Sequence, residues 1–242
     1  MSLDPARART WHHLGIGPLW LMRGATVAAA QTPAVQSDSD ETREFRIGRM
    51  DWVQLRSAVA DCTACALCKT RKQTVFGVGF QGAQWMLVGE APGAEEDQRG
   101  EPFVGQAGRL LDNLLAAAGL TRAGATEHSV YIANVLKCRP PGNRNPEPTE
   151  VALCEPFLLR QVQLVQPRVV VVMGRFAAQS LLHTDATIAS LRGRVHHIDV
   201  AGRKVPIVVT YHPAYLLRNL ADKAKSWADL CLARDVYERS SA

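Results

Sequence analysis

A chain of 242 residues with 47 % hydrophobic and 21 % charged side chains has the composition of a globular protein, which excludes a disordered or fibrous chain. Its length suits one well-buried domain with some extra sequence, and its longest apolar runs are too short to span a membrane, so we expect no membrane association. A net charge of +5 favours an anionic partner such as nucleic acid, although many proteins without such a partner are equally basic.

The first 49 residues show no sustained hydrophobic period, and the polar run TPAVQSDSDETRE at 32–44 is typical of a linker. An apolar stretch before this run has some features of a secretory signal. Arg23 interrupts it and Gly and Pro break it, so we expect a cytoplasmic protein. The sequence therefore predicts a poorly ordered extension over residues 1–49, with Met50 as an alternative start, and one folded domain over residues 50–242.

From residue 50 onward, helical and strand patterns alternate, beginning with Trp52, Leu55 and Val59 on one helical face. In chain order we expect a strand at 85–89, a helix at 107–120, a strand at 130–135, a helix at 149–165, a strand at 169–173, a helix at 175–182, a hairpin or two edge strands at 195–200 and 205–210, and a helix at 222–239. Apolar strands separated by helices predict an α/β fold whose mainly parallel sheet is covered on both faces.

Three unusual stretches begin where predicted strands end. GEAPG follows the first strand, NVLKCRPPGNRNP the second and YHPAYLLRN the last. Because ligands of open α/β sheets bind at the carboxyl ends of the strands, these stretches predict one shared active site.

Five of the six cysteines fall in two groups, which is not the spacing of a small disulfide framework. Cys62-x2-Cys65 and Cys138-x15-Cys154 could supply four thiolates to a zinc ion or to an iron–sulfur cluster, and the wide second spacing favours the cluster. Cys68 extends the first group and is a competing ligand. The alternative is that the second pair consists of buried core thiols, as we expect for Cys231.

Three long motifs, GEAPGAEEDQRGEPFVGQAGRLLDNLL, NVLKCRPPGNRNPEPTE and HPAYLLRN, together resemble the family 4 uracil-DNA glycosylases, the iron–sulfur type. The preceding CTACALCKTRKQTVFGVG is similar to the start of that family's domain, so the resemblance covers roughly residues 50 to 238. It implies a three-layer α/β/α sandwich that excises uracil from DNA and leaves an abasic site without a lyase step. It also implies a [4Fe–4S] cluster, on Cys62, Cys65, Cys138 and Cys154.

The resemblance gives three side chains a chemical role. After the nucleotide has been flipped out of the helix, Phe103 would stack on the base; the alternative is a core residue, but Pro102 and Gly105 around it favour a loop. Asn134 would donate to uracil O4 and accept from N3–H, a pattern that cytosine reverses; an Asn can also serve as a turn or cap. His212, fixed by Pro213, would donate to uracil O2 as the base departs with negative charge. The alternative is that His212 is an ordinary polar residue at the surface.

The GEAPG motif supplies the rest of the expected substrate site. Gly89, Glu90 and Ala91 open it, and Ala91 stands where better-known glycosylases have a water-positioning Asp, which leaves Glu90 as the nearest candidate base. Gly93 stands where the best-studied enzymes have a bulky Tyr that excludes thymine. Family analogy gives that task to Glu96, unless the acidic run is only a solvated turn.

Single- and double-stranded DNA containing uracil is the expected partner, bound by a monomer. A leucine would enter the gap left by the flipped base, and cationic side chains would hold phosphates. The predicted DNA contacts are Leu216, Leu217, Arg218, Lys137, Arg139 and Arg144.

Other classes of function remain as alternatives. A covalently trapping relative would need a histidine in the loop after Cys138, where this chain has RPPGNRNP. A DNA-sensing iron–sulfur or zinc protein would need the cysteines but not Phe103, Asn134 and His212. A redox carrier would have no need for a pocketed α/β fold.

Overall fold

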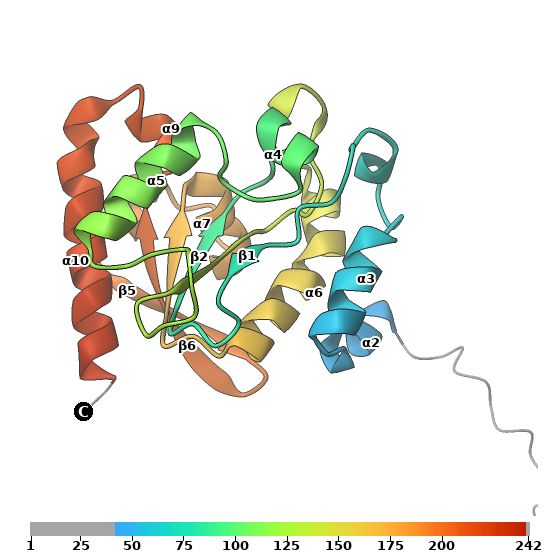
Figure 1. Ribbon diagram of the computed structural model, residues 1–242, viewed down its shortest axis with the longest axis horizontal. Coiled ribbons are helices and arrows are strands. Elements are labelled where there is room, and N and C mark those ends of the chain that lie inside the picture. Colours follow the sequence, from blue (N-terminus) through green and yellow to red (C-terminus); the bar gives the residue numbers. More distant parts are fainter. Residues whose placement is uncertain (1–41, 241–242) are drawn as a thin grey trace, which may run out of the picture. The chain divides into compact units, whose positions relative to one another are not determined.

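A central sheet carries the fold, and the computed structural model describes it within residues 42–240. Six strands in this range form one sheet in the order β1-β3-β2-β4-β6-β5 (Figure 1). The strands are β1 (Val78–Gly79), β2 (Trp85–Gly89), β3 (Val130–Asn134), β4 (Val169–Met173), β5 (Val195–Val200) and β6 (Arg203–Thr210). The four central strands are parallel, and β1 and β5 run antiparallel at the two edges. This mixed sheet confirms the predicted α/β class.

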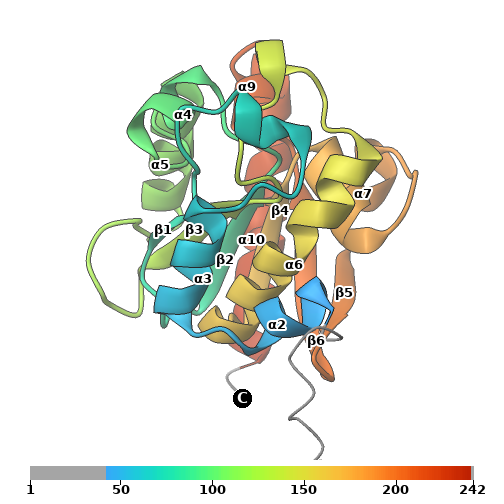
Figure 2. The same ribbon diagram turned by 90° about the vertical axis from the view of Figure 1, so that its right-hand side faces the viewer.

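Helices cover both faces of the sheet, as Figures 1 and 2 show. One layer consists of α5 (Gln106–Ala117) and α10 (Lys223–Arg239), and the other contains α6 (Pro148–Val165) and α7 (Arg175–Leu182). Successive side chains of β2 point to opposite faces of the sheet, and both faces are apolar. Met86 and Val88 pack in the core under α6 and α7, and Trp85 and Leu87 pack in the core under α5 and α10. Strands buried on both faces appear in the sequence as continuous apolar runs.

Shorter elements connect this framework. They are the helices α4 (Ala94–Arg99), α8 (Ile188–Leu191) and α9 (Pro213–Leu216) and the 3₁₀ turns η1 (Ala66–Lys69), η2 (Pro141–Asn143) and η3 (Leu220–Asp222). The long helices and strands expected from the sequence are all present, with ends that differ by a few residues, and the hairpin of β5 and β6 is confirmed. No helix in residues 42–240 is long and apolar enough to cross a membrane.

The predicted boundary of the N-terminal extension is wrong for its last residues. Arg43–Arg49 forms helix α2, which precedes α3 (Trp52–Ala60). Ile47 is buried in a cluster with Leu55 and Phe157, and Arg43 donates from Nη1 to the carbonyl oxygen of Leu153 at 2.7 Å. Apolar burial and this hydrogen bond order the segment despite its polar sequence. The rest of the predicted extension, residues 1–41, lies outside the described part of the chain.

If α2 belongs to the folded domain, Ile47→Ala should lower the free energy of unfolding by roughly 2–5 kcal/mol, because it opens a cavity in this cluster. Phe45→Ala on the same helix is the matched control, since Phe45 is 56 % exposed; its effect should stay within about 0.5 kcal/mol. Urea unfolding followed by circular dichroism measures both. Equal effects of the two substitutions would contradict a structural role of α2.

Candidate active site and cysteine pocket

The carboxyl ends of β2 and β3 lie side by side, because Gly89 pairs with Asn134 in their parallel register. A side chain cannot replace the hydrogen of Gly89: a Cβ atom there would overlap the Asn134 side chain and come within 2.6 Å of the Phe103 ring. The glycine therefore allows both the amide of Asn134 and the ring of Phe103 to lie against the backbone at the end of β2.

Phe103 connects this group to the end of β6. Its ring stacks on the ring of His212, with centroids 5.5 Å apart and planes inclined by 30°. The residue is 6 % exposed and also packs in the α5–α10 core, so its burial is compatible with both predicted roles. Its backbone adopts φ 56°, a left-handed conformation that costs a bulky residue roughly 1–3 kcal/mol. Such strain persists only where neighbouring contacts hold it.

Asn134 has an unused hydrogen-bonding atom. Its side chain is 2 % exposed, and its Oδ1 is buried without a hydrogen-bond partner among the described residues. An unpaired buried acceptor costs about 1–3 kcal/mol, which an N–H donor from a ligand would offset. The atom meets the requirement for an acceptor from uracil N3–H.

The tautomer of His212 follows from its backbone environment. The Nδ1 atom accepts a hydrogen bond from the backbone N–H of Ala214 at 3.1 Å, so the neutral ring carries its proton on Nε2. Burial lowers the pKa of His212 to about 4; the carboxylate of Glu96 opposes this shift and Arg218 adds to it. The ring is therefore a neutral donor at physiological pH.

Glu96 is bound into the loops and is not part of a solvated acidic turn. Its Oε2 accepts from the backbone N–H of Gly93 at 3.1 Å, and its Oε1 accepts from Val104 at 3.0 Å and Gly105 at 3.4 Å. These bonds join the GEAPG turn to the loop that carries Phe103. Of the other two acidic residues, Glu95 is exposed and Asp97 is buried.

Glu90 points toward a different part of the molecule. It lines a cavity of about 460 Å³ together with Val135 and residues of α6 and α7, whereas Phe103, Asn134 and His212 are not among the lining residues. Burial raises the pKa of Glu90 to about 7, and the charge of Arg175 opposes the shift. Ala91 packs against the Leu67–Leu136–Cys138 cluster, beside the cysteines.

Two of the predicted DNA contacts are contradicted by burial. Lys137 is 1 % exposed, and its Nζ donates to the backbone oxygen of Asn134 at 2.7 Å and to Gln161 Oε1 at 2.6 Å, so it cannot reach a phosphate. Leu216 is fully buried and cannot enter a DNA helix, whereas the neighbouring Leu217 is 39 % exposed. Of the two leucines that the sequence offered for this contact, only Leu217 is exposed.

The other predicted cations differ in their partners. Arg144 pairs with the buried carboxylate of Glu150 at 2.6 Å, and Arg139 donates to Asn143 Oδ1 at 2.8 Å. Arg218 is exposed at the end of α9, beside Leu217. Arg175, just after the carboxyl end of β4, is also exposed, and no sequence motif around it indicated a role.

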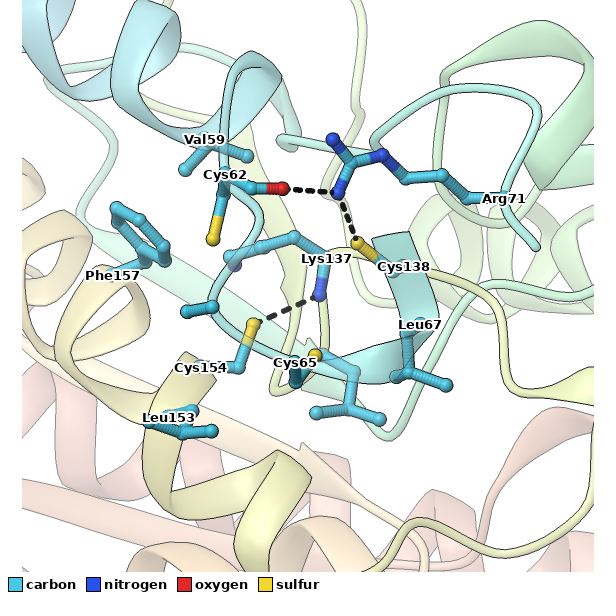
Figure 3. Close-up of a pocket in the computed structure, with 12 residues that line it drawn as sticks. Val59, Cys62, Cys65, Leu67, Arg71, Lys137, Cys138, Leu153, Cys154 and Phe157 are labelled. Atoms are coloured by element: carbon cyan, nitrogen blue, oxygen red, sulfur yellow. Dashed lines mark hydrogen bonds between the residues drawn. The ribbon is translucent and has the colours of Figure 1, made fainter. Parts of the chain in front are cut away.

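The four predicted cysteine ligands line one pocket, which Figure 3 shows. Cys62 and Cys65 come from the segment after α3, Cys138 follows β3 and Cys154 lies in α6. Cys68 is not among the lining residues. No three His, Cys, Asp or Glu side chains within residues 42–240 form a group that could hold a single metal ion. In a four-iron cluster each thiolate binds a different iron, so ligands spread around a pocket fit that group.

Positive groups and N–H donors surround these sulfur atoms. Arg71 donates from Nη1 to Cys138 Sγ at 3.1 Å, and the backbone N–H of Lys137 points to Cys154 Sγ at 3.3 Å (Figure 3). Burial raises the pKa of the Cys138 thiol, which the Arg71 hydrogen bond opposes, and raises that of Cys154 to about 12. Without a bound cation these thiols are protonated, so the donors and charges suit thiolates bound to a metal centre. The spacing of the cysteines gave no signal for Arg71.

Sequence comparison assigns the family. Residues 76–231 match the family model of the uracil DNA glycosylase superfamily. The chain is 46 % identical to a type-4 uracil-DNA glycosylase of Archaeoglobus fulgidus over 66 % of this chain and 79 % of the relative. It is 38 % identical to a type-4 enzyme of Pyrobaculum aerophilum over 76 % of this chain and 93 % of the relative, and 43 % identical to one of Thermotoga maritima over 69 % and 83 %. With its strand-end motifs at one site and four cysteines around one pocket, the chain belongs to the uracil-DNA glycosylase superfamily and, within it, to the type-4 uracil-DNA glycosylases.

Proposed function

We propose that the protein hydrolyses the N-glycosidic bond of uracil in single- and double-stranded DNA and leaves an abasic site. One observation carries this proposal: the Phe103 ring, the unpaired Oδ1 of Asn134 and the Nε2–H of His212 belong to one group at the strand ends. These are a stacking surface, an acceptor and a donor, which together match the face and the polar edge of a flipped uracil.

Asn134 provides selection against cytosine. Its Oδ1 accepts from uracil N3–H, and its amide N–H donates to O4. Cytosine presents an acceptor at N3 and a donor at C4, so it would leave polar groups on both sides buried and unpaired. Mismatches in a site built for hydrogen bonds are worth up to about 10⁴-fold in selectivity.

His212 stabilises the leaving group. As the glycosidic bond breaks, negative charge develops on the base, and the Nε2–H of His212 donates to uracil O2. The fixed tautomer means that this donor is in place before the reaction, without a cost of reorganisation. Glu96 supports the same loops, and its carboxylate limits the space beside the base, where the thymine methyl group would lie.

Glu90 is the proposed base for the attacking water, which would reach the sugar from the side of the cavity that Glu90 lines beside α6 and α7. It directly follows Gly89, and a carboxyl group with a pKa near 7 suits proton transfer at physiological pH. The sugar then reacts as an oxocarbenium-like species, with the water held by Glu90 and nearby backbone groups. No lysine is assigned as a nucleophile, so the product is an abasic site.

DNA binding would use the exposed end of α9. Leu217 enters the space that the flipped nucleotide leaves, and Arg218 holds a phosphate. Arg175 adds a second exposed cation on the same edge of the sheet. These groups do not read base sequence, in keeping with an enzyme that recognises a single damaged base.

We further propose that Cys62, Cys65, Cys138 and Cys154 hold a [4Fe–4S] cluster. When bound, the cluster would cross-link the segment after α3 to the region of Cys138 and Cys154. It would have a structural role and would take no part in breaking the glycosidic bond. The donors around the pocket support negatively charged ligands.

The direct test of the activity uses a labelled oligonucleotide with one uracil, treated with protein and then with alkali, beside a thymine control. His212→Ala should lower kcat about 10²–10³-fold because it removes one preorganised donor. His197→Ala is the matched control, since His197 is exposed on β5, and should leave kcat unchanged. Cleavage at thymine, or an unaffected His212→Ala enzyme, would contradict this mechanism.

The pKa of Glu90 predicts a pH profile. A base must be deprotonated, so kcat/KM should fall about tenfold per pH unit below pH 7 and level off above it. Glu90→Gln should be slower and lose this dependence, whereas Glu95→Gln, in the exposed part of the same motif, should retain it. A wild-type profile that is level from pH 5 to 8 would rule out Glu90 as the base.

Cluster binding predicts different results for different cysteines. Cys138→Ala should purify with less iron, weaker visible absorption and a lower melting temperature, because one ligand of a buried site is missing. Cys68→Ala and Cys231→Ala are controls outside the pocket and should match the wild type in all three measurements. Bound zinc in place of iron, or equal iron loss in Cys68→Ala, would contradict the assignment.

A further inference from the structure

We propose that Arg122 is a positioning residue that holds Phe103 in the conformation needed to stack on uracil. Arg122 lies in the loop after α5, and no role was expected for it from the sequence. The inference rests on the proposed stacking role of Phe103 and adds a residue outside the base-binding group.

The contacts of Arg122 converge on the backbone of the Phe103 loop. Its Nη1 donates to the carbonyl oxygens of both Pro102 and Phe103, each at 3.1 Å. Its Nε donates to Asp112 Oδ1 at 2.6 Å, which fixes the guanidinium from the side of α5. The Arg122 side chain is only 16 % exposed, so these bonds are largely shielded from competing water.

A second charged side chain, the carboxylate of Glu96, also holds the loop. Glu96 accepts from the N–H groups of Val104 and Gly105, directly after the two carbonyls that Arg122 binds. Gly108 in α5 lets the Phe103 carbonyl approach, because an added Cβ would overlap that oxygen. The guanidinium of Arg122 on two carbonyls and the carboxylate of Glu96 on the next two N–H groups thus fix the backbone of residues 102–105.

This double attachment explains the conformation of Phe103. A phenylalanine with φ 56° would relax to an extended or right-handed conformation if the loop were free. Relaxation would rotate the Cα–Cβ bond and carry the ring away from His212 and Gly89. Arg122 therefore controls the position of the stacking surface without touching the base.

Lysine is not an equivalent replacement. Its ammonium can bind one carbonyl, but it lacks the planar set of donors that reaches two carbonyls and a carboxylate at once. Arg122→Lys should therefore retain part of the function that Arg122→Gln loses.

A double-mutant cycle between Arg122 and Phe103 tests the inference. Arg122→Gln should lower kcat/KM for uracil excision about tenfold, and Arg122→Lys should restore part of the loss. In the Phe103→Ala background, Arg122→Gln should change kcat/KM less than twofold, because no ring remains to be positioned. Arg234→Gln, at an exposed site on α10, should leave kcat/KM unchanged in both backgrounds.

Each other outcome identifies what is wrong. A tenfold loss in both backgrounds means that Arg122 acts through general stability, and an Arg122→Gln enzyme as active as the wild type excludes any positioning role. If Phe103→Ala alone is as active as the wild type, the proposed stacking role fails first. Should Arg122→Gln not fold, Asp112→Asn gives the same cycle, because Asp112 holds the guanidinium and is 49 % exposed.

Discussion

The parallel register of β2 and β3 is the constraint on which the site depends. Gly89 lies opposite Asn134, and just beyond the strands the N–H groups of Val135 and Leu136 donate to the carbonyls of Gly89 and Glu90, each at 3.0 Å. A register shift by one residue would turn the Asn134 side chain to the opposite face of the sheet. Both strands are buried at every position, so side-chain packing against the two helical layers holds this register and with it the position of the Asn134 amide.

The same segment connects Asn134 with the cysteine pocket. Within five residues the chain passes from Asn134 to Cys138, and Lys137 between them binds the backbone oxygen of Asn134 while its own N–H points to Cys154 Sγ. A buried ammonium group needs hydrogen-bond acceptors, and the backbone oxygen of Asn134 and Oε1 of Gln161 provide them. The proposed base-reading residue and the proposed cluster ligands thus share one short segment of backbone.

Much of the fold was predictable because long apolar strands and amphipathic helices leave strong periodic patterns. Short elements were not: α4 and α9 have six and four residues, too few for a period to appear. The closeness of Asn134 and His212 followed from strand order, since Asn134 ends β3 and His212 follows β6, whereas Phe103 lies in the loop between α4 and α5 and was placed by its motif. Burial of Lys137 and Leu216 did not follow from sequence, because a lysine is seldom buried and because a four-residue helix decides which of two adjacent leucines faces the core.

The polar contacts that hold the loops were the least predictable part. The carboxylate of Glu96 and the guanidinium of Arg122 bind backbone groups that are distant in sequence, and backbone groups have no sequence signature of their own. A charged residue in a loop is usually solvated, so these two could be recognised only when the fold brought their partners within reach.

The dimensions of β1 limit how the sheet can grow. An open edge of a sheet is a template on which another chain can add a strand, with aggregation as the result. At the β3 side of this sheet the outermost strand is Val78–Gly79, only two residues long and ending in a glycine of φ 114°. Little extended backbone is left there for an incoming strand to pair with. The shape of this edge, and not its charge, therefore protects the sheet on that side while its parallel strands, which are distant in sequence, come together during folding.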